Sequence, residues 1–449
     1  MKYNRILPAI LIVVLLISAF AGCGAAKPEE SKPAAPAEEK KEEAKPAEKK
    51  TVVLYMEDDF IRDSYKDFYK EFEDQNNATV KPILVPKDKY VQSFMVAANG
   101  GQEIDVLYMN GQDVRSFAKK GLIADMTGEV TFWDRFFDNA VEQFTFGGKK
   151  YAVPTNSGAT SGVYYNKEIL DKYGLQPPKT FEDLAAMNKV LSKDGISTFA
   201  FGGASKYMWP MWYFDTLAQT SGGKSVERTV EALQGKAKWT DPDFVEAMEA
   251  LAKFGRENLF QKGFNGAEQA QGNAVFTSGK AALFFGGTWE IDGFRKAGLT
   301  GDKLGIVPFP VVKEGAVSQQ TGSAAGAGMS FYSKIRPENK EIALKLIDYL
   351  SSDKKMTELN KLANTAMAPN KGYTAEGADP IFTGTVNKDL VPSTVTFLDW
   401  IWAPEIVKEF QDGIQAVVGG KISAADEMAR IQKVFDDIKA KGYDFDATK

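Results

Sequence analysis

Apolar residues in the region that begins at residue 51 follow two alternating patterns. Short continuous apolar runs predict three buried strands, at 51–56, 78–85 and 104–109. Each run is followed by apolar residues at helical spacing, which predict helices over 61–72, 90–98 and 114–119. Strands that alternate with helices of this length are typical of βαβ units in a mostly parallel sheet. The pattern therefore predicts an α/β fold.

Helix signals recur further along the chain. Pro177 and Pro178, followed by Thr180 as an N-cap, predict a helix over 181–191. Apolar residues on one face predict another helix over 341–350. A single hydrophobic core stops growing well below the length of this chain, which is 449 residues. We therefore expect two lobes or domains.

The charge balance restricts the possible partners. The formal net charge is only -5, and acidic and basic residues are mixed along the chain. Recognition of nucleic acid needs a concentrated Lys/Arg surface, and so does electrostatic binding to an anionic membrane. We expect no nucleic-acid partner and no polybasic membrane-binding face.

The chain contains no histidine, and its one cysteine is Cys23. It therefore lacks the commonest general base and the commonest transition-metal ligand. It can form neither an intrachain disulfide nor a thiolate zinc site, and Ser-His-Asp and Cys-His chemistry are excluded. We expect no metal, no cofactor and no enzymatic activity, although catalysis by two carboxylates remains compatible with the composition.

The amino terminus has the parts of a secretory signal. Lys2 and Arg5 precede an apolar run at 6–20, and small residues lead into Cys23. The run is shorter than the roughly 20 apolar residues that a membrane-spanning helix needs. The small residues before the lone cysteine resemble the bacterial lipobox, although Phe20 stands where that motif usually has Leu. The resemblance implies that 1–22 is a signal peptide and that Cys23 is lipidated on the outer face of the cell membrane.

Residues 23–50 should connect this anchor to the folded part of the protein. After Cys23 they are mostly Ala, Pro, Lys and Glu, with no aromatic or β-branched residue before residue 51. Such a composition cannot bury enough apolar surface to offset the entropy of ordering, so we expect a disordered tether. The prolines disfavour a helix here.

Five segments, in order along the chain, resemble one known family. The first is GKKYAVPTNSGATSGVYYNKEILDKYGLQPPKTFEDL at 148–184, and the second is GKAALFFGGTWEIDGF at 279–294. The others are LGIVPFPVVKEG at 304–315, SKIRPENKEIALKLIDYLSS at 333–352 and EFQDGIQAVVGGKISAADEMARIQ at 409–432. Together they resemble the extracellular solute-binding proteins of family 1, the maltose-binding-protein-like group.

The resemblance implies a two-lobed periplasmic-binding-protein-like fold, in which each lobe is a mostly parallel sheet flanked by helices and the lobes are hinged around a central cleft. We expect an N-terminal lobe of 51–154 with 317–358 and a C-terminal lobe of 159–310 with 362–449. The hinge should lie near 155–158, 311–316 and 359–361. The implied function is capture of a sugar or oligosaccharide in the cleft and its delivery to the permease subunits of an ABC transporter, by a protein that is monomeric.

A sugar site needs flat aromatic platforms and convergent hydrogen-bonding side chains. Trp289 is the first candidate, because it follows Gly287 and Thr288 at a predicted strand-to-helix turn and because this tryptophan often stacks on sugar in the family. The other aromatic candidates are Tyr207, Trp209, Trp212, Trp400 and Trp402. The polar candidates are Glu57, Asp58, Asn110, Gln112, Asn156 and Ser157.

Each candidate has a structural alternative. The tryptophans could be core residues, and the acidic and amide residues could be helix N-caps or solvated loop positions. The segment around Trp209 could be a loop platform or an apolar helix start. Trp400 and Trp402 would point the same way on a strand and diverge on a helix. Tyr164 and Tyr165 resemble the iron-binding tyrosines of some relatives, although here they begin the Tyr-Tyr-Asn-Lys strand usual in sugar binders.

Three other functions remain open on the sequence. The first is an exported carbohydrate-active enzyme with two catalytic carboxylates, for which Glu290 and Asp292 would be one possible pair. The second is a binding protein for a solute other than a sugar. The third is a sensory receptor that uses the same fold without transport, because a fold does not dictate a function.

Overall fold

The computed structural model describes residues 49–58, 64–362 and 365–445. The predicted signal peptide, Cys23 and the tether as far as residue 48 lie outside the described residues, and Lys49–Lys449 form one compact unit. In the described part of the chain, no helix has the length and apolar character needed to cross a membrane.

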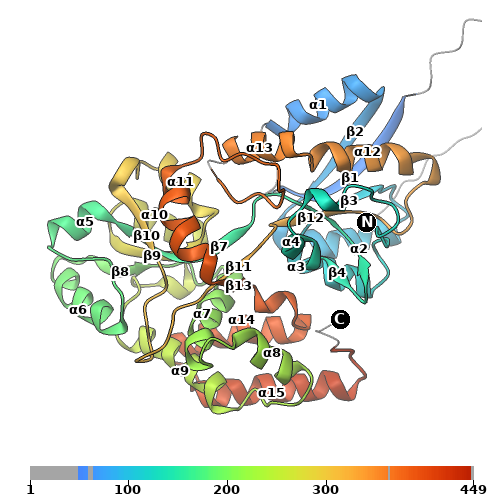
Figure 1. The fold of residues 1–449 in the computed structure, drawn as a ribbon. Helices are drawn as coiled ribbons and strands as arrows, with labels where there is room; N and C mark the ends of the chain where they lie inside the picture. The colour runs from blue at the N-terminus through green and yellow to red at the C-terminus, as the bar shows by residue number, and fades with distance from the viewer. Residues whose placement is uncertain (1–48, 59–63, 363–364, 446–449) are drawn as a thin grey trace, which may run out of the picture. The chain divides into compact units, whose positions relative to one another are not determined.

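The first sheet has five strands in the order β2-β1-β3-β12-β6 (Figure 1). They are β2 (Ala78–Val85), β1 (Lys50–Glu57), β3 (Val106–Asn110), β12 (Ala327–Phe331) and β6 (Val153–Thr155). β1 pairs in parallel with β2 and β3, whereas β12 is antiparallel to both of its neighbours. One strand therefore runs against the other four.

Helices cover both faces of this sheet, because its strands are apolar on both sides. In β1, Val52 and Leu54 point into one core cluster and Tyr55 into the other. The first cluster includes side chains of α1 (Ser64–Asn76), α12 (Lys340–Leu350) and α13 (Asp353–Leu362). The second includes α2 (Tyr90–Asn99), α3 (Gly111–Lys119) and α4 (Asp138–Glu142), close to the hairpin of β4 (Thr145–Phe146) and β5 (Lys149–Lys150).

The second sheet has six strands, with β13-β11-β7-β9-β8 in order and β10 also paired to β7. They are β13 (Thr394–Thr396), β11 (Gln320–Ser323), β7 (Ala159–Asn166), β9 (Ala281–Gly287), β8 (Ser197–Ala200) and β10 (Leu304–Val307). β7 is antiparallel to β9, β10 and β11, while β8–β9 and β11–β13 are parallel pairs. In this sheet β7 alone runs antiparallel to the other strands.

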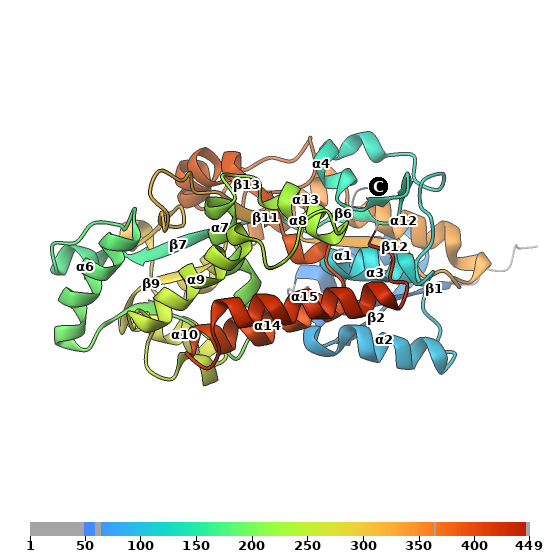
Figure 2. The same ribbon diagram turned by 90° about the horizontal axis from the view of Figure 1, so that it is seen from below.

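The larger core of the second sheet lies under helices that come from distant parts of the chain. They are α5 (Lys167–Lys172), α6 (Phe181–Leu191), α7 (Trp209–Thr220), α8 (Ser225–Leu233), α9 (Pro242–Arg256), α14 (Pro404–Val418) and α15 (Ala424–Ala440). Figure 2 shows α14 and α15 in red next to α9. The opposite face is covered by α10 (Gln269–Thr277), α11 (Glu290–Lys296) and the π-helix Phe382–Leu390.

The two sheets are joined by a ribbon of two antiparallel segments. β6 continues through 156–158 into β7, and β11 continues through 324–326 into β12. Thr155 faces Ala327 in the first sheet, and Ala159 faces Ser323 in the second. The register is therefore the same on both sides of the crossing. A Cβ on Gly158 would lie 2.6 Å from the carbonyl oxygen of Ser323, so the two segments touch there.

The predicted α/β elements are confirmed by β1, α1, β2, α2, β3 and α3, although residues 61–63 of the first predicted helix lie outside the described residues. The helix 181–191 is confirmed, and Thr180 caps it in a capping box with Asp183. The predicted helix over 341–350 is α12, which starts at Lys340. The lobe limits remain a prediction; by strand pairing, β11 belongs to the second sheet and β12 to the first.

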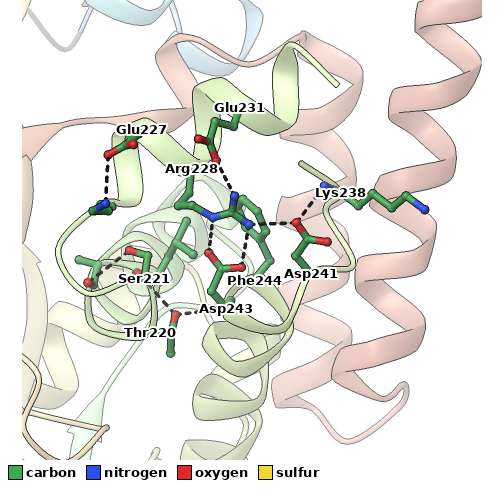
Figure 3. Close-up of polar contacts among 12 residues, drawn as sticks. Thr220, Ser221, Glu227, Arg228, Glu231, Lys238, Asp241, Asp243 and Phe244 are labelled. Carbon is green, nitrogen blue, oxygen red and sulfur yellow. Dashed lines mark hydrogen bonds and ion pairs between the residues drawn. The ribbon is translucent and has the colours of Figure 1, made fainter. Parts of the chain in front are cut away.

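Two charged side chains on the helices that cover the second sheet differ in whether they have partners. Arg228 of α8 makes a bidentate contact to Asp243 and further contacts to Asp241 and Glu231, with Nε–Oδ2 of Asp243 at 2.7 Å (Figure 3). Its guanidinium therefore ties α8 to the start of α9. Glu427 of α15 is 0% exposed, and neither of its carboxylate oxygens has a hydrogen-bond partner among the described residues. Arg430 Nη1 lies 4.0 Å from Glu427 Oε2.

Burial, reinforced by the charge of Glu409, raises the pKa of Glu427 from 4.5 to about 7. The folded protein then holds this proton more tightly than the unfolded chain does. Its stability should fall as pH rises from about 4.5 to about 7 and stay constant above that range. Glu427→Gln should remove this loss and raise the free energy of unfolding at pH 8 by on the order of 2 kcal/mol. Urea unfolding at pH 5 and pH 8 measures the difference.

The matched control is Asp436→Asn, because Asp436 is an exposed carboxylate on the same helix. Its effect on stability should be small and equal at the two pH values. An equal effect of Glu427→Gln at both pH values would show that the buried carboxyl does not change its ionisation over this range.

Candidate functional site

A cavity of about 360 Å³ brings together side chains from both sheets and from the ribbon that joins them. Eight of the predicted site residues line it: Asn110, Gln112, Asn156, Ser157, Tyr207, Thr288, Trp289 and Trp400. The sequence did not single out the other lining residues: Lys87, Gly158, Ala159, Met211, Ser323, Gly326, Thr365, Phe397 and Asp399. The volume of the cavity lies at the small end of the range for small-molecule sites, which starts at about 300 Å³.

Three aromatic rings form a continuous wall of this cavity. The Trp289 ring centroid lies 6.4 Å from that of Phe397, which lies 5.2 Å from that of Trp400. Trp289 is 42% exposed, although it belongs to one of the residue types with the most apolar surface. An exposed indole beside two further rings offers a flat apolar surface to a ligand. Tyr207 adds a fourth ring, over which the ammonium of Lys87 lies at 4.8 Å.

Amide and hydroxyl side chains that line the cavity come from the end of β3, from α3 and from the crossing segment. Asn110 ends β3 and Gln112 lies in the first turn of α3, as expected for side chains at the carboxyl end of a parallel strand. Asn110 occupies the N-cap position of α3, but its side chain makes no capping hydrogen bond. The capping alternative therefore does not account for this side chain. Asn156 and Ser157 lie in the crossing segment, and Asn156 has a positive φ of 63°.

Asp399 is the carboxylate of the cavity lining. Its Oδ1 is buried and has no hydrogen-bond partner among the described residues. Burial raises the pKa of Asp399 to about 7, and the nearby Lys87 opposes this rise. The two charged groups could have been anticipated in part. Lys87 follows the carboxyl end of β2, at the same sheet edge as Asn110, and Asp399 is the immediate neighbour of Trp400.

Three predicted aromatic residues lie in the hydrophobic core and do not line this cavity. Trp209 and Trp212 are fully buried in α7, which is buried on all sides, so this segment is an apolar helix start. The indole N–H of Trp209 donates to the carbonyl of Gly203 at 3.0 Å. Trp402 stacks on Phe410 at 4.2 Å between centroids. Trp400 ends a short 3-10 turn, so the two tryptophans diverge.

Three further predicted residues do not line the cavity. Glu57 is buried near Tyr90, whose pKa its charge helps to raise, and Asp58 is exposed. Gly287 lies beneath the Trp289 ring, because a Cβ there would be 2.2 Å from the indole Cζ3. Gly287 therefore acts on the site indirectly, by leaving room for the ring that lines it.

The geometry does not favour iron binding by the tyrosine pair or catalysis by the carboxylate pair. Tyr164 donates to the carbonyl of Gly287 at 2.8 Å inside one core, and Tyr165 packs against the other, so the two hydroxyls do not converge. Glu290 accepts hydrogen bonds from three side chains, and Asp292 pairs with Lys296 at 2.8 Å. Neither carboxylate lines the cavity. No group of three or more acidic residues suited to a metal ion occurs within the described ranges.

Trp400 also contacts α3 of the first sheet's helices directly. Its indole covers Gly111 at the start of α3, where a Cβ would lie 2.5 Å from Cη2 and Cζ3. A second cavity, of about 720 Å³, is lined by Gly111 and shares Gly158, Ala159, Ser323 and Trp400 with the first. The contact between Trp400 and Gly111 therefore helps to bound both cavities.

Gly111→Ala should displace the Trp400 indole, because the added methyl group would overlap the ring. Overpacking of this kind typically costs about 1–3 kcal/mol of stability. The displaced ring should be more accessible to acrylamide quenching, and the change should vanish in a Trp400→Phe background. Gly128→Ala is the control, because a Cβ there meets no atom within 4 Å. Equal quenching in Gly111→Ala and Gly128→Ala would contradict the contact.

Similar proteins were found among curated sequences. A galactooligosaccharide-binding protein of Bacillus subtilis (strain 168) is 24% identical over 317 residues, which cover 68% of this chain and 70% of that protein. A multiple sugar-binding protein of Streptococcus mutans serotype c is 22% identical over 411 residues, which cover 90% of each. An uncharacterized ABC transporter extracellular-binding protein of Pyrococcus horikoshii is 28% identical over 217 residues, and the match spans only 48% of its length.

Solved structures agree on the fold. A chitin oligosaccharide binding protein matches with a TM-score of 0.74 at 20% identity, over 87% of this chain and 100% of that chain. The solute-binding protein RafE in complex with raffinose matches with a TM-score of 0.70 at 19% identity, over 87% and 99%. These similarities show the two-lobed α/β fold. The family model of the bacterial extracellular solute-binding proteins matches residues 61–357, well over half of the chain, and the chain therefore belongs to this family.

Proposed function

We propose that this protein binds a carbohydrate in the cavity lined by Trp289 and Trp400 and delivers it to the permease of an ABC transporter. The observation that carries the proposal is the aromatic wall of Trp289, Phe397 and Trp400, in the same cavity as amide and hydroxyl side chains. A sugar has apolar ring faces edged by hydroxyl groups, and this combination of rings and polar groups complements both.

The relatives support the same ligand class. The names of two curated relatives refer to galactooligosaccharides and to multiple sugars, and two structural matches are described with chitin oligosaccharide and raffinose. Because the identities are low, these names support carbohydrate as a class and no particular sugar. We propose a binding role without catalysis, since both oxygens of Glu290 already accept hydrogen bonds and Asp292 has an ion-pair partner.

We propose that ligand binding closes two lobes, which correspond broadly to 51–154 with 317–358 and to 159–310 with 362–449. The bending would occur near 155–158, 311–316 and 359–361. Because β11 pairs with β7 in the second sheet, we add 324–326, which lead from β11 to β12, to this proposed hinge. A ligand that touches both lobes binds the closed form more tightly and shifts the population toward it. The cavity has this property, because Gln112 belongs to one lobe and Trp289 to the other.

The first test is thermal unfolding of the full chain, in detergent, against mono- and oligosaccharides, amino acids, polyamines and metal ions. A ligand that binds only the folded state stabilises it by about 2.7 kcal/mol at a concentration of 100 Kd. We expect one carbohydrate class to raise the Tm by several degrees, and Trp289→Ala to abolish the increase. Trp133→Phe, outside the cavity, should retain it. An increase with metal ions or polyamines and with no carbohydrate would refute the ligand class.

We also propose that the chain acts at the outer face of the bacterial cell membrane as a lipid-anchored monomer. The support is the apolar run at 6–20 followed by the lone Cys23, and the membership of an extracellular family. Cys23→Ala should release the protein from the membrane fraction into the soluble extracytoplasmic fraction, as measured by immunoblotting after fractionation. Retention of the variant at the membrane would show that another feature anchors it.

A further inference from the structure

The orientation of the Trp289 ring is fixed by a carboxylate behind it. The indole Nε1 donates to Glu290 Oε1 at 3.0 Å, and the ring lies on Gly287. An indole that is 42% exposed would otherwise be free to occupy other rotamers. The hydrogen bond and the glycine together select one ring plane at the cavity wall.

Glu290 is the centre of a buried network. It is 5% exposed, and Oε2 accepts a hydrogen bond from Asn273 Nδ2 at 2.7 Å. Its Oε1 also accepts from Nε2 of Gln269. No lysine or arginine forms an ion pair with it in the described part of the chain. Burying a carboxylate without a cation is costly, and here three side-chain donors offset part of that cost.

The network extends to a second aromatic residue of the cavity. The Tyr207 hydroxyl donates to Oε1 of the same Gln269 whose Nε2 contacts Glu290. The backbone N–H of Gln269 donates to Ser205 Oγ at 2.9 Å, and Ser205 Oγ donates to Glu268 at 2.8 Å. The loop that carries Tyr207 is therefore held against the start of α10, and Gln269 joins it to Glu290.

From this arrangement we infer that Glu290 is a positioning residue that fixes the planes of Trp289 and Tyr207 together and thereby sets which sugar stereoisomers the cavity accepts. The effect on sugar selectivity rests on the proposed carbohydrate function, whereas the orientation of the two rings does not. The angle between two platforms decides which face of a sugar ring can stack while its hydroxyl groups meet the polar side chains. Glu290 thus controls selectivity without lining the cavity.

Glu290→Gln tests, in the protein without ligand, whether Glu290 holds the Trp289 ring. A glutamine side chain keeps one acceptor oxygen, so three donors compete for it and at least one hydrogen bond is lost. The fluorescence of Trp289, obtained as the difference from a Trp289→Phe variant, should become at least 2-fold more sensitive to acrylamide. Asp292→Asn is the control, because Asp292 lies in the same turn of α11 and pairs with the exposed Lys296. Glu290→Leu, which has no acceptor for the indole N–H, completes the test, and unchanged quenching in both folded variants would overturn the inference.

A second pair of variants separates positioning from direct contact and does not depend on how Glu290→Gln folds. Tyr207→Phe and Gln269→Ala remove the same hydrogen bond from its two ends. The affinity is measured for cellobiose and lactose, which differ in configuration at one carbon, and for the best carbohydrate of the thermal screen. Each variant should change the ratio of affinities by several-fold, and the double variant should do no more than either single variant. Additive effects would mean that Tyr207 and Gln269 act separately, which would contradict the network.

The outcomes for the inference and for the proposed function can be distinguished. Increased quenching of Trp289 with no binding of any carbohydrate to the wild-type protein would keep the positioning role and refute the ligand class. Carbohydrate binding with unchanged quenching and unchanged affinity ratios would keep the ligand class and refute the positioning role.

Discussion

The antiparallel ribbon between the two sheets is the constraint on which the rest of the structure depends. The same register runs from the pair Thr155–Ala327 to the pair Ala159–Ser323, so the crossing contains no inserted residue. A register shift by one residue would turn every side chain of a strand to the opposite face. The ribbon therefore determines which side chains of β12 and of β7 point to each face of their sheets. Its crossing segments also line part of the cavity.

Around this ribbon, the site combines aromatic rings with carboxylates whose pKa values are raised by burial. Trp289 and Trp400 offer apolar surface, while Asp399 and Glu290 stay close behind or beside them with raised pKa values. Burial is the main cause of both shifts. Binding proteins need such surfaces in place before the ligand arrives, because ordering them during binding would reduce affinity. The buried network behind Trp289 and the glycine beneath it provide this order.

The elements that could be predicted are those whose hydrophobic period is local. Neighbouring residues are enough to predict three features. These are the βαβ pattern from β1 to α3, the capped helix at 181–191 and the turn that carries Trp289. The positions of other side chains depend on tertiary packing, which a local pattern does not show. Trp209 and Trp212 belong to a helix that is buried on every side. Trp400 and Trp402 separate because a 3-10 turn ends between them. Phe397 was missed because only the fold brings it next to Trp289.

The position of β12 in the first sheet has a consequence for the order of folding. The strand lies between β3 and β6, yet it is Ala327–Phe331, and almost the whole second sheet is synthesised between β6 and β12. The first sheet cannot complete its pairing until that long excursion has emerged, so its closing contacts are distant in sequence and slow to form. A chain with this topology keeps an incomplete sheet with an unpaired edge until late in synthesis, and such an edge is prone to aggregation until β12 fills it.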